Sequence, residues 1–278
     1  MCIVSLLACI LTPVRSSTPR FFSRIVHNTV VMSAYLLLFA AALGAGLMNS
    51  VAGGGSFLTF PALVFTGVPS IIANASSTVG LLPGVFTSAW AYRRHFKPLE
   101  GVSFKALFGV SVAGGVTGAL LLLYTSQAMF DVIIPWLLLL ATCVFVFGRN
   151  LSLLLQSTVR IGPKTVIGAQ FLVGVYGGYF GGAIGIIMLA VWSLLGAYDI
   201  HALNANRTLL GGSMNCAAVV LFIIAGKVWW LQTVVILIGS VTGGYLGARF
   251  ARGTNPLHVR RIATAISVAV TVAFFARL

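Results

Sequence analysis

The stretch that decides the fold reads Gly44-Ala45-Gly46-Leu47-Met48-Asn49-Ser50-Val51-Ala52-Gly53-Gly54-Gly55-Ser56-Phe57-Leu58-Thr59-Phe60-Pro61. It lies in an apolar run, residues 33–66, that exceeds the ~20 residues one helix needs to cross a bilayer. Three consecutive glycines break a helix, and a break at membrane depth is tolerated only where the freed backbone is buried in protein or lines a wet cavity. We therefore predict a broken or re-entrant helix. Its second half begins with unpaired N–H groups and a positive dipole end, which suit an anion.

A second long apolar run, residues 166–197, is interrupted in the same way by Gly174-Val175-Tyr176-Gly177-Gly178-Tyr179-Phe180-Gly181-Gly182-Ala183-Ile184-Gly185. Paired interruptions in two halves of a chain indicate a transporter binding site near the bilayer midplane. Close helix packing is the alternative explanation of such glycines. It is favoured for Gly114/Gly118 and Gly243/Gly247, whose four-residue spacing is typical of packing, and both explanations stay open for the three glycines of the first break.

Composition excludes a water-soluble fold, since 59% of the residues are hydrophobic and 7% are charged, against ~45–50% and ~25% in soluble domains. The apolar runs are too long and continuous for the alternating strands of a barrel. We expect an all-α, polytopic transmembrane bundle of about eight spans, one for each of the runs 33–66, 71–92, 102–124, 131–148, 166–197, 202–225, 229–250 and 258–276.

An internal repeat relates the two halves of the chain. Residues 111–119 match residues 240–248, a shift of 240 − 111 = 129, and Asn74-Ala75-Ser76 matches Asn204-Ala205-Asn206 at 204 − 74 = 130. The double glycines of the two breaks differ by 181 − 53 = 128. These shifts predict two homologous four-span repeats, residues 32–148 and 166–278, joined by a basic linker, 149–165.

Residues 1–31 form a lead that contains arginines but no acid. Three interpretations are open: a transit or signal-like segment, a cytoplasmic lead, or an extension from a start codon assigned too early. The third is preferred, because Met32 opens the first clean span. Counting Lys and Arg near span ends places the lead, the loop at 93–97 and the linker on one side. Four spans per half would then place Arg249, Arg252, Arg260 and Arg261 on the opposite side, and this conflict is unresolved.

Polar clusters follow both breaks in the next apolar run: Asn74, Ser76, Ser77 and Thr78 in the first half, and Asn204, Asn206, Arg207 and Thr208 in the second. The planar donor fork of Arg207 suits an oxyanion. Alternatively, this arginine snorkels to an interface or binds the carbonyls at a helix end. The predicted substrate-binding residues are Asn49, Gly53, Gly54, Gly55, Ser56, Asn74, Ser76, Thr78, Gly181, Gly182, Asn204, Asn206 and Arg207.

The formal net charge of +14 is explained by basic cytoplasmic loops that face anionic lipid, without a nucleic-acid partner. We see no Ser/His/acid set, metal cluster or phosphate loop, so we expect neither an enzyme nor a cofactor or metal. The expected partners are a small anionic substrate and the lipid bilayer. Whether the chain forms a homo-oligomer stays open.

The pattern in the first half resembles the sulfite exporter TauE/SafE family of membrane permeases, and the likeness extends from about residue 34 to the end. It is carried by Asn49-Ser50-Val51-Ala52-Gly53-Gly54-Gly55-Ser56, Pro61-Ala62-Leu63, Ala73-Asn74-Ala75-Ser76, Leu81-Leu82-Pro83-Gly84 and Trp90-Ala91-Tyr92-Arg93-Arg94. The resemblance implies movement of sulfur-containing oxyanions or organosulfonates across a bacterial cytoplasmic membrane. We therefore expect a two-repeat permease; the alternatives are a passive anion channel and a non-transporting membrane subunit or enzyme of sulfur metabolism.

Overall fold

The computed structural model describes residues 20–51, 54–99, 101–158, 161–195, 200–250 and 256–277. The chain divides into two units, Met1–Leu36 and Leu37–Leu278. The described part of the first unit is helical. All the packing described here belongs to the second unit.

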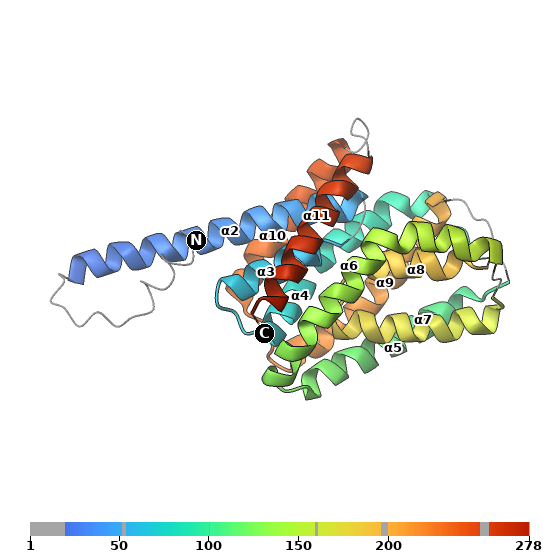
Figure 1. The fold of residues 1–278 in the computed structure, drawn as a ribbon, viewed down its shortest axis with the longest axis horizontal. Coiled ribbons are helices and arrows are strands. Elements are labelled where there is room, and N and C mark those ends of the chain that lie inside the picture. The colour runs from blue at the N-terminus through green and yellow to red at the C-terminus, as the bar shows by residue number, and fades with distance from the viewer. Residues whose placement is uncertain are drawn as a thin grey trace. The chain divides into compact units, whose positions relative to one another are not determined.

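The described ranges contain helices and no β-strand, which confirms the all-α prediction. The elements, labelled in Figure 1, are α2 (Arg20–Val51), α3 (Ser56–Phe65), α4 (Ser70–Tyr92), α5 (Phe104–Tyr124), α6 (Gln127–Thr158), α7 (Pro163–Tyr179), α8 (Ile184–Ser193), α9 (Ile200–Ile224), α10 (Trp230–Phe250) and α11 (Pro256–Phe275), with a 3-10 turn at Arg93–His95.

Six of these helices contain a stretch long and apolar enough to cross a bilayer, namely Val31–Asn49, Ser70–Trp90, Phe104–Tyr124, Gln127–Gly148, Ala202–Ile224 and Trp230–Gly247. The outward faces of the helices are apolar, with Trp136 of α6, Leu172 of α7 and Val272 of α11 more than half exposed, whereas the polar side chains of Ser111 and Gln170 are buried. Apolar side chains outside and satisfied polar ones inside are what a helical bundle in lipid requires.

The chain leaves helical geometry at both predicted breaks. Before α3, Gly54 has a φ of +87°, and before α8, Gly181 and Ala183 have φ angles of +81° and +57°. Glycine takes such left-handed angles without a steric penalty, whereas Ala183 carries a real cost. Each of the two apolar runs predicted to be interrupted therefore contains two helices.

Each short helix folds back against the helix that precedes it. In the first half, a Cβ built on Gly55 would lie 2.6 Å from Ala45 O, and one built on Gly44 would lie 3.1 Å from Leu58 Cδ1. Residue numbers rise along α3 as they fall along α2, so the two helices are antiparallel. The second half repeats this arrangement.

In the second half, the broken helix is fixed by a buried polar chain. Trp192 Nε1 of α8 donates to Gln170 Oε1 of α7 over 3.1 Å, and Gln170 Nε2 donates to Ser111 Oγ of α5 over 2.8 Å. Ile184, at the other end of α8, lies against Gly177. Helix α8 is therefore antiparallel to α7.

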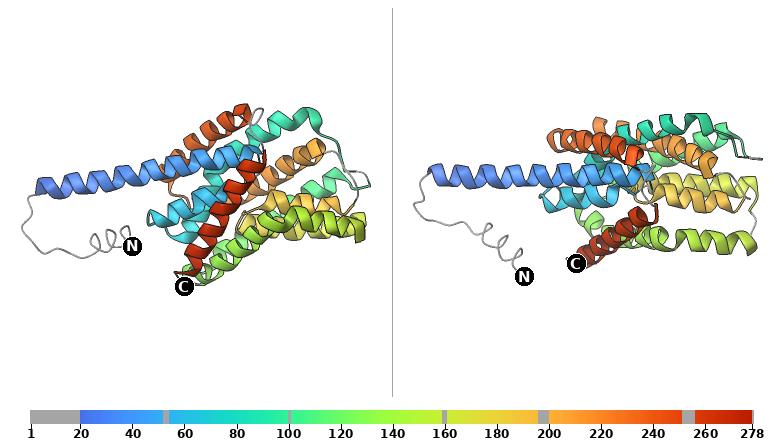
Figure 2. Two further views of the ribbon diagram at one scale, coloured as in Figure 1. Left: turned by 45° about the horizontal axis from the view of Figure 1, so that its top comes forward. Right: turned by 90° about the horizontal axis from the view of Figure 1, so that it is seen from above.

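Glycine contacts show that α5 and α7 run in the same direction. A Cβ on Gly114 would lie 2.6 Å from Phe171 O, and one on Gly118 would overlap Val175 O. Figures 1 and 2 show these two helices side by side. The predicted packing role of these glycines is thereby confirmed.

Helices α2, α4 and α10 run parallel to one another by the same criterion. A Cβ on Gly239 would lie 2.9 Å from Phe39 O, and one on Gly243 would overlap Leu43 O. Between α4 and α10, Trp229 N, directly before α10, donates to Ser76 Oγ over 3.0 Å, and Ser240 Oγ donates to Gly80 O over 2.9 Å, so residue numbers rise together along the two helices.

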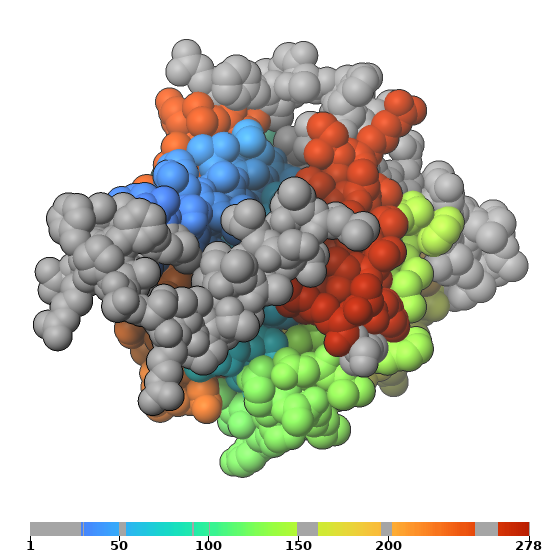
Figure 3. Space-filling model, turned by 60° about the vertical axis from the view of Figure 1, so that its left-hand side comes forward, coloured from blue at the N-terminus to red at the C-terminus, as the bar shows by residue number. Residues whose placement is uncertain are grey.

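Helices α6 and α11 pack antiparallel, side by side in green and red in Figure 3. The rings of Trp136 and Phe275 lie 5.3 Å apart, and the hydroxyls of Thr142 and Thr271 lie 2.9 Å apart. Tight connections at residues 125–126 and 225–229 make α6 antiparallel to α5, and α10 antiparallel to α9. The C-terminal ends of α4, α6 and α10 therefore lie on one side of the bundle.

Candidate functional site

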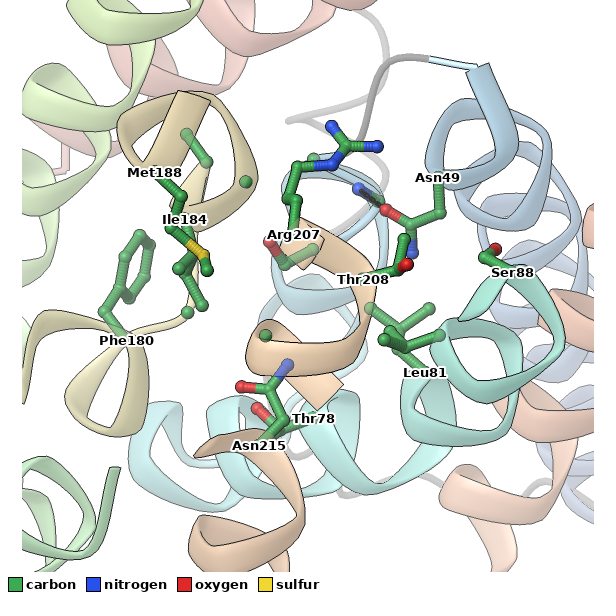
Figure 4. A pocket seen from close by; sticks show the side chains of 18 residues that line it. Asn49, Thr78, Leu81, Ser88, Phe180, Ile184, Met188, Arg207, Thr208 and Asn215 are labelled. Carbon is green, nitrogen blue, oxygen red and sulfur yellow. Dashed lines mark hydrogen bonds between the residues drawn. The ribbon is translucent and has the colours of Figure 1, made fainter. Parts of the chain in front are cut away.

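Both broken helices open into one pocket with a volume of about 120 Å³ (Figure 4). Helices α2, α3, α4, α8 and α9 line it, together with the connection between α7 and α8. The lining residues are Asn49, Gly54, Gly55, Ser56, Thr78, Leu81, Val85, Ser88, Phe180, Gly181, Ala183, Ile184, Gly185, Met188, Arg207, Thr208, Gly211 and Asn215.

The first break presents the N-terminal end of α3 to the pocket. Asn49 Oδ1 accepts a hydrogen bond from Gly55 N over 2.8 Å, which ties the break to the end of α2. No described group accepts a hydrogen bond from Ser56 N. A helix leaves its first N–H groups without intrahelical partners, so this amide is a donor available to a ligand.

The second break presents the N-terminal end of α8. Phe180 N and Gly181 N both donate to Tyr176 O, at 2.9 and 3.3 Å, and this closes the end of α7. Within the described part of the chain, nothing accepts from Ile184 N or Gly185 N, the first two amides of α8. Two half-helix N-termini, each equivalent to roughly +0.5 charge, thus face the same pocket.

Arg207 brings one unit positive charge to the pocket. It lies on α9, is 9% exposed and lines the pocket, so it does not snorkel to the surface. Its Cδ and Nη1 would lie 2.8 and 3.2 Å from a Cβ on Gly185, so the side chain crosses the first turn of α8. Asp131 is the one carboxylate that the structure describes, and it is bonded to Ser70 and Gln127. Among the described residues, therefore, Arg207 has no ion-pair partner.

The end of the pocket away from the Arg207 guanidinium is formed by Thr78 and Asn215 (Figure 4). Thr78 Oγ1 donates to Asn74 O over 2.8 Å. Asn215 Oδ1 is buried and has no hydrogen-bond partner among the described residues. The pocket therefore combines a cationic end with a neutral polar end.

Of the predicted site residues, seven line the pocket: Asn49, Gly54, Gly55, Ser56, Thr78, Gly181 and Arg207. The other described ones do not: Asn74, Ser76, Gly182, Asn204 and Asn206. Gly53 lies outside the described residues. The hydrogen bonds of three of the non-lining residues explain their positions.

Asn74, Ser76 and Asn206 are buried and bonded to backbone groups of other segments. Asn74 Nδ2 donates to Tyr179 O over 3.0 Å, at the end of α7, and Ser76 Oγ accepts from Trp229 N over 3.0 Å. Asn206 Nδ2 donates to Lys97 O over 2.7 Å. These side chains hold helix ends and connections in place around the pocket.

Sequence reasoning missed Gly185 and Asn215 as pocket residues. Asn215 carried a usable signal, because a polar side chain inside an apolar span is costly in lipid and therefore marks a functional position. Gly185 carried none on its own, since its role depends on the arginine that packs over it. Among the described residues, no group of three or more His, Cys, Asp or Glu side chains is placed to hold a metal ion.

Comparison with known proteins gives a consistent result. The chain is 28% identical over 247 residues to the "Probable membrane transporter protein YfcA" of Escherichia coli K12, covering 88% of this chain and 91% of that protein. It is 27% identical over 242 residues to the "Probable membrane transporter protein ORF9" of Sinorhizobium sp, covering 86% and 91%. A Haemophilus influenzae protein called "Probable membrane transporter protein" is 26% identical over 248 residues, covering 84% and 92%.

No solved structure matches the chain significantly. The apolar helices and the transporter relatives together make it an integral membrane protein. The model of the family described as "Sulfite exporter TauE/SafE" matches residues 38–274. The chain therefore belongs to the sulfite exporter TauE/SafE family.

Proposed function

We propose that the protein is a permease for small anions, of the sulfur-containing oxyanion or organosulfonate class, which bind in the pocket between its two broken helices. One observation carries the proposal: both half-helix N-termini and the buried Arg207 line the same pocket. The family description and the names of the relatives support transport as the activity, and the description of the family supports the substrate class.

The electrostatics of the empty pocket favour an anion. Arg207 and two helix N-termini together amount to roughly two positive charges, and the guanidinium lies against the first turn of α8. Like charges at close range in a medium of low dielectric constant repel each other strongly. An anion that bridges Arg207 and the free amides of Ile184 and Gly185 would replace this repulsion with charge-assisted hydrogen bonds.

An arrangement of two inverted repeats accounts for the pocket. Helices α2, α3, α4, α5 and α6 correspond in order to α7, α8, α9, α10 and α11, and both α3 and α8 have 10 residues. Each half holds five helices, an odd number, so corresponding helices run in opposite directions. That is the geometry of transporters with inverted repeats, whose substrate sites lie near the midplane between the halves.

Contacts at equivalent positions support the repeat. A Cβ on Gly174 of α7 would lie 3.2 Å from Ser111 O of α5, and one on Gly46 of α2 would overlap Ser240 O of α10. The pairs correspond by the shifts found in the sequence, 174 − 46 = 128 and 240 − 111 = 129. In both contacts the first helix of one half packs on the fourth helix of the other.

The same arrangement supports an orientation in which the basic loops of both halves lie on one side. The C-terminal ends of α4, α6 and α10 lie on one side, and the sequence at these ends carries Arg93, Arg94 and Lys97, then Arg149, Arg160 and Lys164, then Arg249, Arg252, Arg260 and Arg261. By the positive-inside rule this side is cytoplasmic. The short helices α3 and α8 provide the additional reversals that eight single spans lack. We place the protein in a bacterial cytoplasmic membrane, where the two halves rock about the pocket.

Replacing Arg207 by glutamine tests the site. Purified protein in liposomes is expected to show saturable uptake and counterflow of sulfite or a simple alkanesulfonate. Arg207→Gln should raise the half-saturating concentration at least about tenfold, because a hydrogen bond to a charged group contributes ~1.5–3 kcal/mol. The matched control is Arg261→Gln, which removes a charge at an exposed position and should leave uptake unchanged.

Three outcomes would contradict the proposal. Conductance without counterflow would indicate a passive channel, and neither conductance nor uptake of any anion would indicate a non-transporting subunit. Equal apparent affinity of wild type and Arg207→Gln for every transported anion would remove the arginine from the site.

A further inference from the structure

We infer that Asn74 and Asn204, which occupy equivalent positions in the two halves, are the two gate residues of the transport cycle. In the present structure Asn74 closes the outer side of the pocket. Asn204 closes the cytoplasmic side after the halves have rocked to the opposite state. The inference rests on the proposed function and deepens it, because it assigns the structure to one state of the cycle and names the hydrogen bond that replaces the present one in the other.

The pocket lies toward one side of the bundle. On α4 every lining residue lies between Thr78 and Ser88, and none comes from the beginning of the helix, Ser70–Ser77. On α9 the lining residues begin at Arg207 and end at Asn215, well before the C-terminal end of the helix. The C-terminal end of α4 and the N-terminal end of α9 share the side that carries the basic loops. In the proposed orientation, the pocket therefore lies nearer the cytoplasm.

The outer side of the pocket is closed by contacts between the two halves. Asn74 Nδ2, near the outer end of α4, donates to the carbonyl of Tyr179, the last residue of α7, over 3.0 Å. The next residue, Phe180, lines the pocket, and its ring packs edge-on against Phe60 of α3 at 5.8 Å. Phe60 in turn stacks on Phe274 of α11 at 5.7 Å. These buried contacts join α3 and α4 of the first half to α7 and α11 of the second.

The equivalent hydrogen bond on the cytoplasmic side is not made. Asn204 is the counterpart of Asn74 (204 − 74 = 130), and Val51, the last residue of α2, is the counterpart of Tyr179 (179 − 51 = 128). The Asn204 side chain is partly buried and makes no hydrogen bond with the described residues. If inverted halves exchange their conformations when the protein changes state, Asn204 Nδ2 donates to Val51 O in the opposite state.

The side chains next to the two gate residues favour the present state. The counterparts of Phe60 and Phe180 are Met188 (188 − 60 = 128) and Ala52 (180 − 52 = 128). The ring pair that closes the outer side therefore has no equivalent in the sequence for the cytoplasmic side. Aromatic pairs add stability beyond the area they bury, so the protein without substrate should face the cytoplasm most of the time.

Labelling of a cysteine in the pocket measures the balance of the two states. Gly211 lines the pocket, and a Cβ built on it meets no atom within 4 Å, so Gly211→Cys fits there in a protein without its native cysteines. The reagent is sulfonatoethyl methanethiosulfonate, which is small, anionic and impermeant. It is applied without substrate to intact cells and to inverted membrane vesicles. This parent protein should react faster in the inverted vesicles.

Replacing the two gate residues should shift the balance in opposite directions. Asn74→Ala removes the bond that closes the outer side, so labelling from outside should rise by roughly two- to tenfold, the range of one net hydrogen bond. Asn204→Ala removes a bond made only in the opposite state, so labelling from outside should fall by a similar factor. The double variant should return toward the rate of the parent.

A matched control and the choice of residues separate gating from folding. Thr87, also on α4, donates its hydroxyl proton within the helix to Gly84 O over 2.8 Å, and Thr87→Ala should leave both labelling rates unchanged. Asn204→Ala alters a side chain without a hydrogen-bond partner among the described residues. It should fold and report on the gate even where Asn74→Ala assembles poorly.

The results that overturn the inference differ from those that overturn the proposed function. Equal outside labelling of the parent and both single variants would overturn the inference, and so would a change of the opposite sign. Unchanged labelling of Asn204→Ala with a weaker apparent affinity would assign this asparagine to the substrate instead. Saturable uptake of sulfite by the wild-type protein would persist in these cases. Absence of saturable uptake of any anion by the wild-type protein would refute the permease, and the inference with it.

Discussion

Replacing Gly185 by alanine should move the arginine of the site without disturbing the helices. The added Cβ would lie 2.8 Å from Arg207 Cδ, 3.3 Å from Cγ and 3.2 Å from Nη1. Ordinary contact begins near 3.4 Å, so Cδ has to shift by about 3.4 − 2.8 = 0.6 Å. The nearest atoms belong to a flexible side chain and not to backbone, so Arg207 moves and α8 stays.

The expected effect is a weaker site in a protein of equal or greater stability. A displacement of this size misaligns charge-assisted hydrogen bonds worth ~1.5–3 kcal/mol, and the loss of about half of that weakens apparent affinity by roughly three- to tenfold. Alanine is favoured over glycine inside a helix by ~0.8–1 kcal/mol. The melting temperature should therefore stay the same or rise while the half-saturating concentration increases.

Counterflow in proteoliposomes measures the affinity, and thermal unfolding in detergent measures the stability. Gly168→Ala is the matched control, because no atom lies within 4 Å of a Cβ built at that helical position. It should show the same change in stability with unchanged affinity. If Gly185→Ala transports every anion with wild-type affinity, Arg207 does not touch the substrate and the proposed geometry of the site is wrong.

Two further predictions concern packing and orientation. Gly118→Ala forces a Cβ onto Val175 O, a backbone atom that cannot move without shifting the helix, and should destabilise the protein by ~2 kcal/mol or more in thermal unfolding. The control Gly109→Ala has open space at its Cβ and should not destabilise the protein. Equal melting temperatures of the two variants would contradict the close α5–α7 contact. In a protein without its native cysteines, Lys227→Cys should react with an impermeant thiol reagent from outside intact cells, and Ser103→Cys should react only after the membrane is opened. The opposite result, with Ser103→Cys labelled from outside and Lys227→Cys only after opening, would reverse the topology, and labelling of both from outside would contradict their placement on opposite sides.

The helices and their breaks were largely predictable because their causes are local. Long apolar runs favour helices in lipid whatever surrounds them. Glycines with φ angles of +87° at Gly54 and +81° at Gly181 adopt a conformation that other residues rarely take, so their clustering marks the two interruptions. The sequence left open whether each short helix continues the direction of the preceding helix or reverses it, because that depends on which neighbour covers it.

The pocket lining was predictable only in part, because a polar residue in a span can face either a cavity or a backbone group. Asn74 and Asn206 resemble Thr78 in type and position, yet they bond to Tyr179 O and Lys97 O while Thr78 reaches the pocket. The choice depends on which carbonyl a neighbouring segment leaves free. Such carbonyls lie at helix ends and connections, and their positions follow from the assembled bundle and not from local sequence.

The orientation of the basic loops and the anion pocket have a common cause in the proposed arrangement. If α3 continued in the direction of α2, the first half would hold an even number of crossings, and its repeat would return in the same orientation. The N-termini of α3 and α8 would then lie at different depths, and Arg207 would face only one of them. In the proposed arrangement each broken helix folds back, so the second half is inverted, and both positive helix ends line the pocket together with Arg207. On this proposal, the glycines that reverse the chain determine both the membrane topology and the charge of the pocket.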